Sequence, residues 1–116
     1  MDLRYIIIKV KDIERAKAFY VRFLNMEPTK IERDRMVVFD LKNVKIGLYN
    51  PVADGDTISD SDFGTNYYAA FGTDDVDAEL KRVSEFAEIM SRKKVDYHDW
   101  FEFKDTEGNA LEVHKI

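Results

Sequence analysis

The sequence contains no cysteine, and this absence excludes disulfide bonds, thiolate zinc sites and a cysteine nucleophile together. Glycine is also scarce, and the stretch "YAAFGTDD" has too few glycines to form a nucleotide-binding loop. The only isoleucine run, in "MDLRYIIIKVK", is three residues long and stands between charges. We therefore expect neither a signal peptide nor a membrane span, and we expect a cytoplasmic protein.

The sequence also lacks an excess of positive charge: it has 18 Lys and Arg and 23 Asp and Glu, which gives a net charge of -5. No basic stripe is present, which argues against a nucleic-acid partner. The triplet at residues 92–94 is too short to count as one, and we interpret it as a solvated segment. The acidic balance suits a cationic ligand, although many cytosolic proteins share it. With 116 residues, 45% hydrophobic and 35% charged, the chain fits one compact domain or two small fused halves.

The first half of the chain has a strand, a helix and then three strands. Residues 5–10 are β-branched and predict a strand, and Asp12 offers an N-cap oxygen to the helix that follows. Apolar residues then recur at the spacing of one helical face: Ile13, Ala16, Tyr20, Phe23 and Leu24. Three further strands are predicted at residues 29–32, 36–41 and 44–49.

The second half repeats this order. Residues 67–73 predict a strand, Asp75 an N-cap, and Val76, Leu80, Val83 and Ala87 a second helical face. Strand signals follow near residues 89–91, 98–104 and 110–114. A shift of 63 residues superimposes Asp12 on Asp75, and near the end of each half a shift of 65 superimposes Ile46-Gly47-Leu48 on Leu111-Glu112-Val113. We therefore predict two modules, residues 1–50 and 67–116, joined by a solvated linker at 51–66.

Two such strand–helix–strand–strand–strand (βαβββ) modules predict an α+β fold. Each exposes a sheet face that it cannot cover alone, so we expect a curved eight-stranded mixed sheet with helices outside and a ligand cleft inside. Strand alternation assigns an apolar set of side chains to the helix side and a mixed set to the cleft. The predicted cleft side chains include Tyr5, Lys9, Met36, Asp40, Lys45, Gly47, Tyr49, Tyr68, His98, Trp100, Glu102, Glu112 and His114.

The two ends of the chain carry a resemblance to a known family. The stretches "YIIIKVKDIERAKAFYVRFLNMEP" and "FEFKDTEGNALEV" resemble the opening and the closing signature of the glyoxalase/bleomycin-resistance/dioxygenase superfamily, also called the vicinal oxygen chelate superfamily. In the closing turn, Gly108 and Asn109 suit the positive φ that such a hairpin needs. The resemblance implies the two-module fold, but the superfamily hosts several chemistries as well as plain binders.

Metal-dependent members of the family place four side chains in the cleft, and the resemblance assigns them to Tyr5, Gly47, Tyr68 and Glu112. Only Glu112 is a good ligand, and one carboxylate falls short of what a divalent ion needs. We therefore expect no cofactor at these positions. A shifted divalent-metal site stays open as an alternative, because Glu112 and His114 are two apart on one strand and other donors share the face: Asp40, His98 and Glu102.

The leading hypothesis is a metal-free protein that binds a small aromatic or cationic molecule in its cleft. The residues expected to contact the ligand are Tyr5, Met36, Tyr49, Tyr68, Trp100, Glu102 and His114. Trp100 is the strongest candidate, because the only tryptophan lies mid-strand on the predicted ligand side. The resemblance also implies a homodimer, because bleomycin-type resistance proteins hold a drug in clefts shared by two subunits.

Glu112 has three readings: a general acid or base, a fixed charge that recognises a cationic ligand, or an inherited residue paired with Lys9 or Lys45. The first supports a competing hypothesis, a lyase, isomerase or dioxygenase that uses Glu112 as base or a non-standard metal site. A purely structural dimerising module is a third possibility.

Overall fold

The computed structural model describes residues 3–62, 64, 69–96 and 98–116. The chain divides into two compact units, Met1–Phe63 and Gly64–Ile116, which we call the first and second modules. Each is a βαβββ unit with one four-stranded mixed sheet, so the predicted α+β fold class is confirmed. The predicted Tyr68 and the start of its strand lie outside the described residues.

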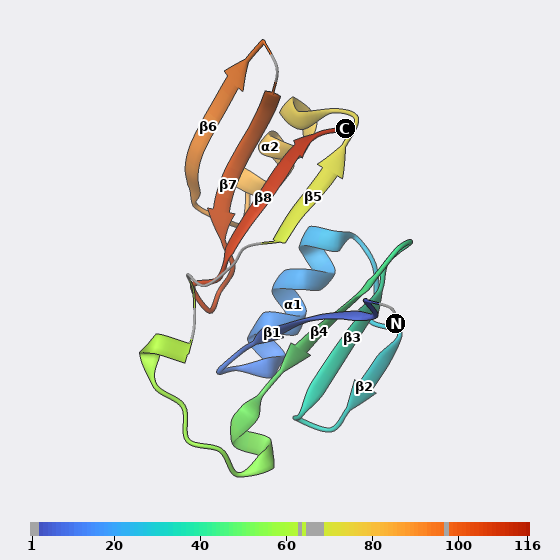
Figure 1. Ribbon diagram of the computed structural model, residues 1–116, viewed down its shortest axis with the longest axis vertical. Coiled ribbons are helices and arrows are strands. Elements are labelled where there is room, and N and C mark those ends of the chain that lie inside the picture. The colour runs from blue at the N-terminus through green and yellow to red at the C-terminus, as the bar shows by residue number, and fades with distance from the viewer. Residues whose placement is uncertain (1–2, 63, 65–68, 97) are drawn as a thin grey trace. The chain divides into compact units, whose positions relative to one another are not determined.

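The first module begins with a strand and a helix and ends in two short 3-10 helices. Its elements are β1 (Tyr5–Lys9), α1 (Ile13–Leu24), β2 (Lys30–Glu32), β3 (Met36–Asp40), β4 (Lys45–Tyr49), η1 (Pro51–Asp54) and η2 (Asp60–Asp62). The sheet order is β1-β4-β3-β2, with β1 parallel to β4 and the other pairs antiparallel (Figure 1). The two 3-10 helices form in the segment that the sequence assigned to a solvated linker.

Helix α1 begins and ends where its sequence dictates. The Asp12 side chain accepts a hydrogen bond from the Arg15 backbone N–H at 3.0 Å, as predicted for an N-cap. Asn25 ends the helix in the left-handed conformation, and its N–H donates to the Val21 carbonyl. Phe19 is buried together with most of the predicted face, whereas Leu24 is only half-buried.

The second module repeats the same architecture. Its elements are β5 (Ala69–Thr73), α2 (Val76–Ser84), β6 (Ile89–Val95), β7 (His98–Lys104) and β8 (Ala110–Lys115). The sheet order is β5-β8-β7-β6, again with the first strand parallel to the last. Asp75 caps α2 by accepting from the Ala78 N–H at 3.0 Å. Strand β6 runs four residues beyond its predicted end because it pairs with β7 along nearly its whole length.

The strand registers of the two modules agree with the sequence repeat. Ile7 pairs with Gly47 across β1 and β4, and Ala70 pairs with Glu112 across β5 and β8. These are the same positions that the shifts of 63 and 65 residues superimpose. Gly47 and Glu112 are therefore structurally equivalent, one in each module.

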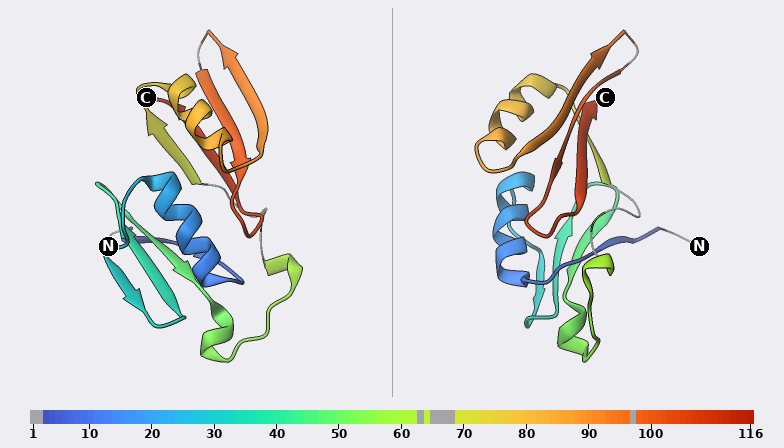
Figure 2. Two further views of the ribbon diagram at one scale, coloured as in Figure 1. Left: turned by 180° about the vertical axis from the view of Figure 1, so that it is seen from behind. Right: turned by 90° about the vertical axis from the view of Figure 1, so that its left-hand side faces the viewer.

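In each module the helix covers one face of its own sheet, and Figure 2 shows this for both helices. The first core lies between α1 and its sheet and contains Ile8, Tyr20, Phe39, Ile46 and Leu48, all almost fully buried. The second lies between α2 and its sheet and contains Val76, Val83, Phe101, Phe103, Leu111 and Val113. Arg92, predicted to be solvated, is half-buried and pairs with Asp77 of α2 at 3.0 Å. One apolar face per sheet leaves the other face available for chemistry.

The turn between β7 and β8 is held by the buried Asp105. One of its carboxylate oxygens accepts from the backbone N–H groups of Glu107 and Asn109, both at 2.8 Å. The other accepts from the Asn109 side-chain amide at 2.9 Å. Gly108 has φ 84°, as predicted. The same expectation for Asn109 was wrong, because that residue stabilises the turn through hydrogen bonds and has no positive φ.

Candidate functional site

The face of the second sheet opposite α2 gathers the polar side chains of β7 and β8. We call it the ligand face and define it by His98, Trp100, Glu102, Glu112 and His114. These residues share one side because they alternate with buried core residues along their strands. The register places Trp100 directly opposite His114 and Glu102 directly opposite Glu112.

Trp100 lies at the centre of a group of rings and a cation. The His98 ring centroid is 4.5 Å from that of Trp100, and the Lys93 ammonium lies 5.9 Å from the indole centroid. Trp100 is half-buried, so part of the ring is exposed. The accessible part of the indole offers a flat stacking surface for a planar ligand.

Glu112 and His114 are joined directly. A Glu112 carboxylate oxygen lies 2.9 Å from Nδ1 of His114, and Glu112 is 9% exposed. His98 approaches the same point, since its ring centroid is 5.5 Å from that of His114. One donor atom from each of these three residues lies within 4.8 Å of the others. The chain has only two histidines, and both are here.

Glu102 adds a second carboxylate to this face. It stands opposite Glu112 on the neighbouring strand, and like charges in that relation repel each other. Glu102 is half-buried, and in the described part of the chain no ion pair to it is found. A cation bound near Glu102 and Glu112 would reduce the repulsion between the two carboxylates.

A hollow of about 500 Å³ lies beside His98. It is bounded by the end of β6, the start of β7 and the C-terminal residues, with His98, Val95 and Ile116 among its lining. His98 thus borders both the hollow and the neighbouring imidazole of His114. A small molecule in the hollow would contact His98 directly.

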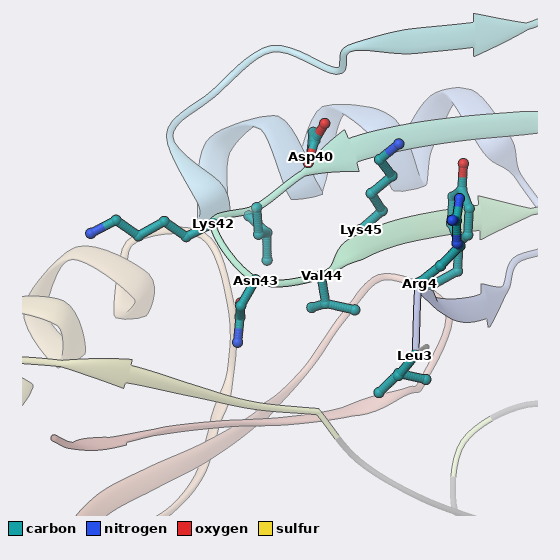
Figure 3. A pocket seen from close by; sticks show the side chains of 9 residues that line it. Leu3, Arg4, Asp40, Lys42, Asn43, Val44 and Lys45 are labelled. Atoms are coloured by element: carbon teal, nitrogen blue, oxygen red, sulfur yellow. The ribbon is translucent and has the colours of Figure 1, made fainter. Parts of the chain in front are cut away.

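In the first module, Tyr5 borders a smaller hollow of about 320 Å³ at the β3–β4 turn (Figure 3). The Lys45 ammonium lies 5.6 Å from the Tyr5 ring centroid. Figure 3 shows Lys45 and Asp40 rising from the same side of the sheet, as their cross-strand pairing requires. Tyr5 is 39% exposed, and the Lys45 ammonium lies over its ring much as that of Lys93 lies over Trp100.

Tyr49 is engaged by the segment that follows β4. Its hydroxyl donates to Asp54 at 2.6 Å, and Arg35 pairs with the same carboxylate at 2.8 Å. The hydrogen bond from Tyr49, followed by that from Arg35, lowers the pKa of Asp54 below its usual range. The hydrogen bond to Asp54 in turn raises the pKa of Tyr49. Its predicted role in ligand binding stays a prediction, since its hydroxyl already serves a local contact.

Gly47 and Met36 lie close together on the first sheet. A Cβ at Gly47 would meet Cδ1 of Ile7 at 2.8 Å and Sδ of Met36 at 3.2 Å. Apolar side chains therefore occupy the space where the equivalent Glu112 projects in the second module. Met36 is half-buried in this contact.

The comparisons with known proteins agree with this two-module architecture. Residues 3–113 match the family described as the Glyoxalase/Bleomycin resistance protein/Dioxygenase superfamily. A match over this much of the chain shows that the protein belongs to that superfamily, which confirms the resemblance in its sequence. No curated protein sequence is similar enough to count as a match.

Solved structures with the same fold belong to proteins with different names. A lactoylglutathione lyase from Agrobacterium tumefaciens is 17% identical, with a TM-score of 0.79 over 98% of this chain and 92% of its own. A glyoxalase/bleomycin resistance protein from Catenulispora acidiphila DSM 44928 is 18% identical, with a TM-score of 0.76 over 99% of both chains. The antibiotic binding protein TnmS3 from Streptomyces sp. CB03234 is 20% identical, with a TM-score of 0.74 over 99% of this chain and 95% of its own. At these identities the likeness shows the fold alone.

The family's four metal positions do not fit a metal ion in this chain. The first module offers the phenol of Tyr5 and the bare backbone of Gly47, with Ile7 and Met36 filling the space beside the glycine. Tyr68 lies outside the described residues, and Glu112 is bonded to His114. Tyrosine and glycine are poor partners for a divalent cation, so these positions do not form the family's metal centre.

The residues expected from the sequence to contact a ligand include Trp100, Glu102 and His114 of the ligand face, but not His98. The available signal was the alternation of β7, which puts His98 on the same side as Trp100.

Among the described residues, no helix is long and apolar enough to cross a membrane.

Proposed function

We propose that this protein binds a small molecule with an aromatic ring and a positive charge on its ligand face, without the family's metal centre. The observation that carries the proposal is the half-buried Trp100 beside two carboxylates, Glu102 and Glu112, on the open side of one sheet. The indole supplies contact area at low entropic cost, and the carboxylates supply charge recognition. Two proteins of the same fold, a glyoxalase/bleomycin resistance protein and an antibiotic binding protein, support a binding role.

The test is a screen of small aromatic cations followed by two substitutions. Trp100 is the chain's only tryptophan, so quenching of its fluorescence reports ligands that reach the face. Calorimetry then compares Trp100→Ala with Met90→Ala, which truncates an exposed apolar side chain of the same module outside the ligand face and should leave the Kd unchanged. We expect Trp100→Ala to raise the Kd of a hit about tenfold or more, which corresponds to roughly 1–3 kcal/mol of stacking. An unchanged Kd in Trp100→Ala would contradict the proposal.

A catalytic role is the second candidate, and the Glu112–His114 hydrogen bond favours it. When the proton lies on Nδ1, the carboxylate orients the imidazole and leaves Nε2 free to accept a proton. The Glu112→Gln variant separates the two functions. Loss of affinity for a cationic hit with retained affinity for its neutral analogue supports recognition. Loss of turnover with unchanged affinity would instead assign Glu112 as a catalytic base.

The quaternary state and location belong to the same proposal. Resistance proteins of the superfamily are expected to work as homodimers, so sedimentation velocity should give about twice the mass of one chain. A monomer at all concentrations would contradict this expectation. The cytoplasmic location stays a prediction from the sequence, to be checked by cell fractionation.

A further inference from the structure

We propose that His98, Glu112 and His114 form a binding site for a divalent transition-metal ion, here called the His–Glu cluster. It lies within the second module and shares only Glu112 with the family's metal positions. The two proposals share Glu112, but metal binding also depends on both imidazoles and not on Trp100, so each can be tested apart from the other. Both histidines of the chain lie in this cluster, although 15 residues separate them in the sequence.

The geometry of the cluster is close to that of a metal site. First-row metals bind nitrogen and carboxylate oxygen at about 2.0–2.2 Å, so adjacent donors of one ion lie about 3 Å apart. The Glu112 oxygen and Nδ1 of His114 are already 2.9 Å apart. The ion would take the place of the proton that joins them. The His98 donor completes the set within 4.8 Å and needs only a side-chain adjustment to close on the ion.

The donor types select the class of ion. Two imidazoles and one carboxylate suit zinc, iron(II), cobalt or nickel, whereas calcium and magnesium prefer oxygen ligands alone. Three protein ligands also leave at least one coordination position open. The hollow of about 500 Å³ is lined by His98, so solvent or a small ligand in it lies beside one of the three donors.

The charges around the cluster favour a cation. Glu102 stands opposite Glu112 and brings a second negative charge within reach. The positive charge of Lys93 would repel a bound metal ion, but its ammonium lies over the Trp100 ring. Lys115 is directed away, since its ammonium donates to the Asp74 carbonyl. On β5 the residue paired with His114 is Gly72, which has no side chain to compete with the imidazole.

The experiment is a zinc titration of the full chain without a histidine tag, after treatment with EDTA. Calorimetry should give one zinc ion per chain. We expect His98→Ala, His114→Ala and Glu112→Ala each to raise the zinc Kd at least about tenfold, because even residues that only orient metal ligands have effects of that size. Glu88→Gln removes an exposed carboxylate of the same module outside the cluster and should leave the Kd unchanged.

A second measurement on the unmodified protein keeps the test decisive if a variant fails to fold. The long-range ¹H–¹⁵N NMR spectrum contains signals from two imidazoles only, and zinc should shift both. The proposal is overturned if no zinc binds, if binding persists in the His98→Ala/His114→Ala variant, or if neither imidazole signal moves. In each of these cases the Trp100→Ala test of organic-ligand binding still stands on its own.

Discussion

At the scale of single residues, Asp54 shows how a local contact sets a titration. Its carboxylate accepts from the Tyr49 hydroxyl and pairs with Arg35, and both interactions favour the charged form. Its pKa is therefore lower in the folded state than in the unfolded state. The resulting contribution to stability is present above the ordinary aspartate pKa and is lost as the pH falls through the folded value.

The Tyr49→Phe variant removes the larger of these two effects. We expect the pKa of Asp54 to rise toward its ordinary range, and a ¹³C NMR titration of the carboxyl group measures this shift. Tyr5→Phe is the matched control, since Tyr5 contacts Lys45 instead. An unchanged Asp54 pKa in Tyr49→Phe would mean that Arg35 alone sets its value.

Side-chain direction was predictable from the sequence, but side-chain convergence was not. Alternation fixed that Trp100, Glu112 and His114 share a face, because the strand period is two. The meeting of His98 with His114 depends on the β7–β8 register, which pairs Trp100 with His114. This register cannot be deduced from the sequence pattern of either strand alone. Equally, composition could not show that apolar side chains of the same sheet close over Gly47.

At the scale of elements, the β7–β8 turn positions the ligand face and offers a direct test of stability. Asp105 is 7% exposed and satisfies two backbone N–H groups and one side-chain amide. In Asp105→Ala these donors lose their acceptor inside the fold. We expect a loss of about 1–3 kcal/mol in the free energy of unfolding, measured by urea denaturation. Thr106→Ala, an exposed neighbour, should change it by less than about 0.5 kcal/mol.

Strands with strong alternation were predicted closely, and weak ones were not. The bounds of β7 agree with the predicted residues 98–104, because aromatic residues alternate with polar ones there. Strand β6 contains a run of basic residues and was recognised only at its start. Its remaining residues are held by pairing with β7, an interaction that its own composition does not reveal.

At the scale of the whole molecule, the two halves of the repeat carry different side chains at equivalent positions. The equivalent positions Gly47 and Glu112 hold a bare backbone in one module and a bonded carboxylate in the other. Both histidines and the only tryptophan lie in the second module. The two halves thus share topology and register, while the proposed ligand and metal chemistry belongs to the second.

Zinc should therefore stabilise the second module measurably. An ion that binds only the folded state at 100 times its Kd adds about 2.7 kcal/mol to the free energy of unfolding. The fluorescence of Trp100, the only tryptophan, reports unfolding at the sheet that carries the His–Glu cluster. We expect zinc to raise the Trp100-detected melting temperature, and EDTA to reverse the rise. The same titration of the His98→Ala/His114→Ala variant should give no rise, and a rise of equal size there would assign the stabilisation to a different site.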